Sequence, residues 1–86
     1  MDSYRIEWKV SASKELSRLD RSTIPRIHEA VSHLAVNLFP NGSCGLKGGE
    51  PTFRIRVGDY GIIYEIVQDR LVVEIIRVRH RKDAYG

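Results

Sequence analysis

Apolar and polar residues alternate without a break near the start of the chain, from residue 4 to residue 10. A β-strand produces this period of two because its successive side chains point to opposite faces. Tyr4, Ile6, Trp8 and Val10 would share the buried face. The pattern therefore predicts a half-buried strand over residues 4–10.

Helical spacing replaces this alternation in the next part of the chain. Ser11-Ala12-Ser13 offers hydroxyls that can cap a short first helix, which we expect to run to about Asp20. Ser22-Thr23 offers a second start, and Pro25 is tolerated in the first turn of a helix. The second helix, predicted over residues 23–38, carries apolar residues at steps of three and four: Ile24, Ile27, Val31, Leu34, Ala35 and Leu38.

Glycine and proline interrupt all periodicity between Pro40 and Pro51, which predicts a connecting loop. Three β-runs follow this loop, with a turn at Gly58-Asp59 and another around Asp69-Arg70. The three runs cover residues 53–57, 60–67 and 71–78. The order βααβββ predicts an α+β fold in which two helices pack on one face of a mostly antiparallel four-stranded sheet.

The Gly58-Asp59 turn also predicts which side chains share a face of the sheet. It sets Val57 opposite Tyr60 and Arg56 opposite Gly61. Arg54 then lies with Arg56 on the face away from the helices, because burying unpaired guanidinium groups would cost much free energy. The face that the helices cover would hold Phe53, Ile55, Val57, Ile62, Tyr64 and Ile66.

Length and composition exclude several classes of protein. The chain has 86 residues, 42% of them hydrophobic and 29% charged, which predicts one folded domain over residues 1–86. No apolar run approaches the roughly 18 residues that cross a bilayer, so no membrane partner is expected. The N-terminus lacks a secretory signal, and the lone Cys44 cannot form an internal disulfide. We therefore expect a cytoplasmic protein.

Basic residues are concentrated near the C-terminus, although the formal net charge is only +3. Together with Arg54 and Arg56, these residues could form a surface for an anionic partner, and basic groups beside an aromatic ring suit single-stranded nucleic acid. The alternative is an ordinary solvated tail. The C-terminal group consists of Arg77, Arg79, His80, Arg81, Lys82 and Tyr85.

Other candidate sites are weaker. His28 and His33 lie on different faces of the predicted helix and have no cysteine or acidic ligand at zinc-like spacing, so neither a metal nor a cofactor is expected. Cys44 has no histidine nearby to activate it. The glycine-rich segment around Lys47 lacks the spacing of a nucleotide-binding P-loop.

The sequence resembles the RelE branch of the RelE/ParE toxin superfamily over nearly its whole length. The similarity lies in the βααβββ order and in five segments: Leu46-Lys47-Gly48, Phe53 to Val57, Gly58-Asp59-Tyr60, Ile63 to Ile66, and Arg77 to Tyr85. The basic strand, the hairpin and the His-Arg to Tyr ending are the most specific of these.

This resemblance implies the toxin of a type II toxin–antitoxin pair, which acts as a metal-independent endoribonuclease on mRNA in the A site of the 70S ribosome. The partner would be a cognate RelB-like antitoxin. By the same resemblance, Arg54 and Arg56 would hold the scissile phosphate, Arg81 would stabilise charge or help the leaving group, and Tyr85 would orient the target base. Lys47, Arg79, Lys82 and position 61 would contribute to substrate binding.

Two departures from the family pattern bear on the chemistry. The family usually carries arginine after the hairpin tyrosine, whereas this chain has Gly61, which leaves a gap beside Arg56 and predicts an attenuated enzyme. Arg56 also replaces the lysine of some relatives, and arginine holds its proton too tightly to serve as a base. The general base then remains open between Tyr85 and His80.

Two rival functions share the predicted fold. One is a ParE-like toxin that inhibits DNA gyrase by protein contact. The other is a binding module without catalytic activity. The Arg54, Arg56, Arg81 and Tyr85 constellation favours the nuclease, because a protein that cleaves nothing has no reason to assemble it.

Overall fold

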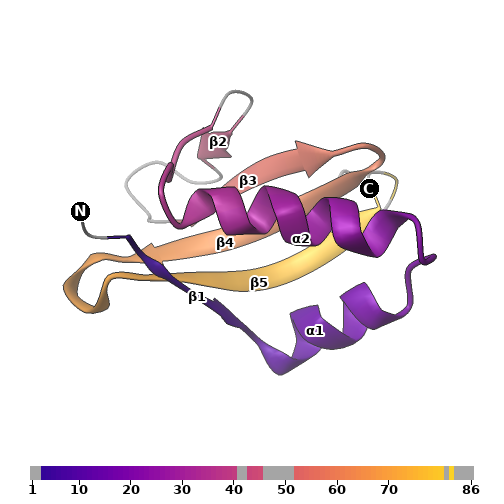
Figure 1. The fold of residues 1–86 in the computed structure, drawn as a ribbon, viewed down its shortest axis with the longest axis horizontal. Coiled ribbons are helices and arrows are strands. Elements are labelled where there is room, and N and C mark those ends of the chain that lie inside the picture. The colour runs from indigo at the N-terminus through magenta and orange to yellow at the C-terminus, as the bar shows by residue number, and fades with distance from the viewer. Residues whose placement is uncertain (1–2, 41–42, 46–51, 81, 83–86) are drawn as a thin grey trace.

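The computed structural model describes residues 3–40, 43–45, 52–80 and 82. One sheet in the strand order β1-β5-β4-β3-β2 carries the helices over one of its faces (Figure 1). β1 is parallel to β5 and the other pairs are antiparallel, which confirms the predicted α+β fold. The elements are β1 (Arg5–Trp8), α1 (Val10–Ser17), α2 (Thr23–Leu34), β2 (Cys44–Gly45), β3 (Thr52–Val57), β4 (Tyr60–Val67), a 3-10 turn (Gln68–Arg70) and β5 (Val72–His80).

The ends of three predicted elements differ from the structure. The N-terminal strand stops at Trp8, because the Ser13 N–H donates to the Lys9 carbonyl and so begins α1 at Val10. The Val10 side chain is therefore not on the buried face of the strand, and 71% of its surface is exposed. α2 ends at Leu34 instead of residue 38. The predicted loop between helix and sheet contains the two-residue strand β2, which adds a fifth, very short strand to the four predicted ones.

Local and tertiary hydrogen bonds meet at the end of α2. The Val36 and Asn37 N–H groups both donate to the His33 carbonyl, at 3.2 and 2.9 Å, which closes the last turn. The Ala35 carbonyl instead accepts a 2.8 Å hydrogen bond from the Tyr4 N–H at the start of the sheet. The Phe39 N–H, which would reach the Ala35 carbonyl in a continuing helix, donates to Asn37 Oδ1 at 3.3 Å. The helix therefore ends before Leu38, although its apolar spacing continues to that residue.

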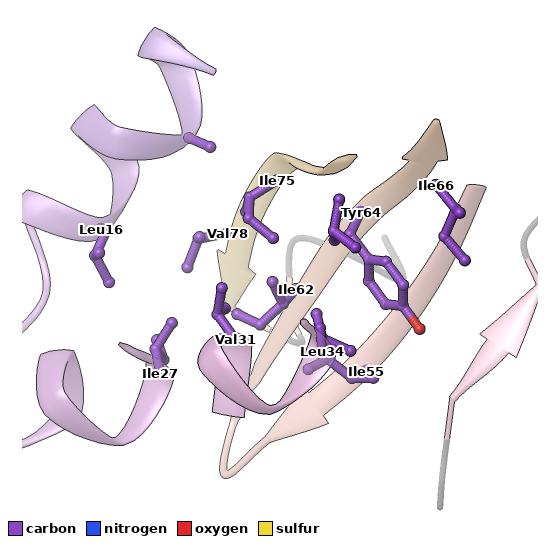
Figure 2. Close-up of a cluster of buried hydrophobic side chains, with 12 residues drawn as sticks. Leu16, Ile27, Val31, Leu34, Ile55, Ile62, Tyr64, Ile66, Ile75 and Val78 are labelled. Carbon is purple, nitrogen blue, oxygen red and sulfur yellow. The ribbon is translucent and has the colours of Figure 1, made fainter. Parts of the chain in front are cut away.

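The core lies between the helices and the strands (Figure 2). Tyr64 is fully buried there, its hydroxyl donates a 2.8 Å hydrogen bond to the Leu38 carbonyl, and burial raises the pKa of this phenol. The hydrogen bond satisfies the single polar group that this large side chain brings into the core. The buried cluster consists of Ala12, Leu16, Ile27, Val31, Leu34, Ile55, Ile62, Tyr64, Ile66, Val73, Ile75 and Val78.

The predicted β3–β4 register is confirmed. Val57 faces Tyr60 and Arg56 faces Gly61, around a tight turn in which Gly58 takes the left-handed φ of 59°. That conformation strains any residue with a Cβ, which explains the glycine.

The β4–β5 pair contains an irregularity that the sequence pattern did not predict. Ile63 pairs with Arg77, but the next residue, Tyr64, pairs with Ile75, so that Ile76 is an extra residue in β5. An extra residue shifts the alternation by one. Val73 and Ile75 before it and Val78 after it all enter the core, while Arg77 and Arg79 lie on the opposite, open face.

No helix within the described ranges has both the length and the apolar character needed to cross a membrane.

Candidate functional site

A row of three residues crosses the open face of the sheet near the hairpin. Arg56 on β3 pairs with Gly61 on β4, and Gly61 pairs with Arg79 on β5. Cross-strand partners project from the same face, so two arginines flank the glycine. Arg56 is exposed, Arg79 is half-buried, and Gly61 itself is buried between its neighbours. The gap left by the glycine therefore has a cationic residue on each side.

A second row lies directly beside the first. Arg54 on β3 pairs with Ile63 on β4, and Ile63 pairs with Arg77 on β5. Planar guanidinium groups can bind phosphate oxygens through two parallel hydrogen bonds, so such a grouping suits a phosphodiester chain. We call the four residues of the two rows, Arg54, Arg56, Arg77 and Arg79, the basic face.

One carboxylate at the border of the basic face was missed by the sequence analysis. Glu15 on α1 accepts a 2.9 Å hydrogen bond from the Val78 N–H through Oε1. Its Oε2 lies 3.8 Å from Arg79 Nε and 3.9 Å from Arg77 Nη1. Glu15 occupies a polar position of an ordinary amphipathic helix, so no local signal separates it from a solvated side chain.

His80 projects from the face of the sheet opposite to the basic face, although it lines one cavity with Arg79. It pairs with Tyr60, and their rings meet edge to face with centroids 5.3 Å apart on the side of the sheet where the helices pack. Its Nδ1 accepts a 3.2 Å hydrogen bond from the Lys82 N–H. A cavity of about 350 Å³ adjoins the two rings and is lined by Glu15, Arg18, Leu19, Tyr60, Val78, Arg79 and His80.

The structure places some of the remaining candidate residues, and others lie outside the residues that it describes. Lys82 is exposed just beyond the end of β5. Lys47, Arg81 and Tyr85 lie outside the described residues, and their roles stay predictions. The described part of the chain contains no group of three His, Cys, Asp or Glu side chains that could hold a metal ion. His28 instead packs its ring against Trp8, with centroids 5.5 Å apart.

Comparison with known families decides the class of protein. Residues 6–85 match the sequence profile described as the ParE toxin of the type II toxin–antitoxin system parDE. The chain belongs to this toxin family. The match extends from β1 past the end of β5 and therefore includes every residue of the basic face.

Individual relatives assign the chain to the RelE branch of the RelE/ParE superfamily. It is 25% identical to the Methanocaldococcus jannaschii protein named RelE1, over 95% of this chain and 94% of that protein. Its structure resembles a chain in the archaeal RelE–RelB complex from Pyrococcus horikoshii, with a TM-score of 0.83, 26% identity and coverage of 92% and 96%. It also resembles a chain in the RelB–RelE complex from Methanococcus jannaschii, with a TM-score of 0.74, 27% identity and coverage of 92% and 94%.

Proposed function

We propose that this toxin is a ribosome-dependent endoribonuclease that cuts mRNA in the A site. The observation that carries the proposal is the basic face, in which four arginines occupy two adjacent rows on the side of the sheet that the helices leave open. Each row holds one arginine on β3 and one on β5, so a phosphodiester chain that crosses a row would meet two guanidinium groups. The substrate class is therefore single-stranded RNA presented by the ribosome in the cytoplasm.

The proposed reaction begins with attack of a ribose 2′-hydroxyl on the adjacent phosphorus. The 2′-oxygen forms a bond to phosphorus as the bond to the 5′-oxygen breaks, which leaves a 2′,3′-cyclic phosphate and a free 5′-hydroxyl. Negative charge grows on the phosphate oxygens in the transition state, and preorganised guanidinium groups stabilise it. Arg54 and Arg56 hold the scissile phosphate, Arg79 adds a third cation, and the mechanism uses no metal ion.

The proton transfers involve the C-terminal residues. Arg81 assists the departing 5′-oxygen, and Tyr85 orients the target base. His80 lies against Tyr60 on the other face of the sheet, and its Nδ1 accepts the Lys82 N–H. We therefore propose that Tyr85, as its phenolate, accepts the 2′-hydroxyl proton, and that the departing 5′-oxygen takes up a proton from water.

Gly61 attenuates this activity in our proposal. It lies between Arg56 and Arg79, where an arginine would add a cation in the centre of the row. Arg54, Arg56 and Arg79 would still contact the phosphate, so we expect a slower enzyme instead of an inactive one.

A RelB-like antitoxin is the proposed partner of this toxin. Two of the similar structures are RelE–RelB complexes, and both cover more than nine-tenths of this chain. A partner with acidic side chains would complement the basic face, and such complementarity accelerates association. Its binding there would also exclude RNA.

The test is cleavage of mRNA in programmed 70S ribosomes, with the 5′ ends of the products mapped. We compare the wild-type chain with Arg81→Ala and with Arg21→Ala, an exposed arginine between the helices that serves as the matched control. We expect cuts confined to the A site, lost in Arg81→Ala and unchanged in Arg21→Ala. Absence of cleavage by both the wild type and Gly61→Arg would overturn the proposal.

Gyrase inhibition is the second candidate, because the matching profile carries the ParE description. DNA supercoiling by gyrase, measured with and without the toxin, tests it directly. Inhibition by a chain that cleaves no message on the ribosome would establish this candidate over the first.

A further inference from the structure

The second half of β5 is bordered by a helix instead of a strand. β1 pairs with β5 only between Val72 and Ile75, because β1 ends at Trp8 and the chain then turns into α1. Beyond Ile75, β5 is an edge strand on this side, and such an edge offers backbone groups without ladder partners. The Glu15 carboxylate occupies this position and accepts the Val78 N–H at 2.9 Å.

The same carboxylate lies between two members of the basic face. Arg77 and Arg79 flank Val78, and one Glu15 oxygen is within 4 Å of both guanidinium groups, at 3.9 and 3.8 Å. These distances are too long for direct hydrogen bonds but short enough for electrostatic attraction. The Glu15 side chain is only 26% exposed, so water screens this attraction less than it would at an open surface.

We propose that Glu15 is a positioning residue for Arg79 in RNA cleavage. Held by the Val78 N–H, its carboxylate restrains the long Arg79 side chain at the edge of β5, beside the gap at Gly61. One negative charge shared by two arginines leaves a net positive charge, and the long contacts leave guanidinium donors available for a phosphate. This inference rests on the proposed nuclease function, and it adds α1 to the elements that build the site.

Two variants separate positioning from structural support. Glu15→Gln removes the charge but keeps an oxygen that can accept the Val78 N–H, whereas Glu15→Ala removes both. Glu29→Gln is the matched control, because Glu29 is an exposed carboxylate on α2 and its loss changes the net charge equally. All four proteins are compared for kcat and KM on programmed ribosomes.

The expected result is a fall in kcat of about tenfold in Glu15→Gln, because misplacing a group that contacts the reacting phosphate slows the chemical step. Glu29→Gln should match the wild type. If the carboxylate acted only as a negative charge near RNA, its removal would instead lower KM and leave kcat unchanged. If it served only the Val78 N–H, Glu15→Gln would cleave at the wild-type rate. Either of these two results overturns the inference.

A double-mutant cycle identifies the group through which Glu15 acts. Arg79→Ala and the combination Glu15→Gln with Arg79→Ala should show the same kcat, because no side chain is left to position. Additive losses would overturn the inference. The arginine Nε–H signals in ¹H–¹⁵N spectra provide a readout without RNA: Glu15→Gln should move the Arg79 signal, and Glu29→Gln should not. An unchanged Arg79 signal also overturns it.

These outcomes distinguish the two proposals. A wild-type chain that cleaves, with an unchanged Glu15→Gln, contradicts the positioning role alone. A wild-type chain that cuts no message contradicts the nuclease function, and the catalytic role of Glu15 fails with it.

Discussion

The two faces of the sheet consist of alternate residues of the same strands, yet their environments differ sharply. On β4, Ile62 is fully buried against the helices, while its neighbour Ile63 lies half-buried on the open face between Arg54 and Arg77. Packing against the helices removes the apolar side chains of one face from water, whereas the charged side chains of the open face stay near water. Stability and candidate chemistry are therefore interleaved along each strand and can be changed separately.

The largest contrast should come from neighbouring isoleucines on β4. Ile62→Ala leaves a cavity under the helices and should lower the free energy of unfolding by about 2–5 kcal/mol. Ile63→Ala, its matched control on the open face, should cost less than half as much. Urea unfolding of both variants measures the difference, and equal losses would contradict the assignment of the faces.

Arg56→Gln, on the open face, should lower RNA cleavage and leave the stability of the fold almost unchanged. Its exposed side chain contributes little to packing, so the free energy of unfolding should change by no more than about 0.5 kcal/mol. Cleavage should fall about 100-fold, as expected when a transition-state donor is lost. Product formation in programmed ribosomes and a urea titration of the same preparation test both halves. A marked loss of stability at wild-type activity would reverse the roles given to the faces.

Gly61→Arg should change activity and stability in opposite directions. One additional charge-assisted contact to phosphate should raise cleavage about tenfold. The new arginine would lie directly between Arg56 and Arg79, and like charges facing each other should cost about 0.2–1 kcal/mol of stability. Cleavage rate and urea midpoint are measured together. Equal cleavage by the two forms would remove the attenuation hypothesis.

The smallest effect should come from the corner between the helices, away from both faces. Hydrogen bonds from the Ser22 and Thr23 hydroxyls hold the pKa of Asp20 below its usual value. This contribution to stability is present above the unfolded pKa of about 4 and is lost as pH falls through the lower folded value. Asp20→Asn should therefore be slightly less stable than the wild type at pH 6, and the two should converge near pH 2. Urea unfolding of both proteins at pH 6 and pH 2 measures the difference in their free energies of unfolding. A difference of the same size at both pH values would contradict the prediction.

Much of the architecture could be predicted from local sequence patterns. The order of the main elements and the pairing of Arg56 with Gly61 depend on near neighbours: alternation, helical spacing and a two-residue turn that begins with a left-handed glycine. These signals act over a few residues, and the steric limits on the backbone make them strong. The positions of Arg54 and Arg56 on the open face follow from the same signals.

The rest of the candidate site depends on contacts between distant residues. The extra residue Ile76 directs Arg77 and Arg79 to the open face, and only pairing with β4 reveals that shift. Glu15 meets Val78 across 63 positions of sequence, where β1 has ended and α1 borders the sheet. Local periodicity determined the strands and the turn of this protein. Tertiary packing decided which arginines share a face and which carboxylate lies beside them, because those contacts form only when distant parts of the folded chain meet.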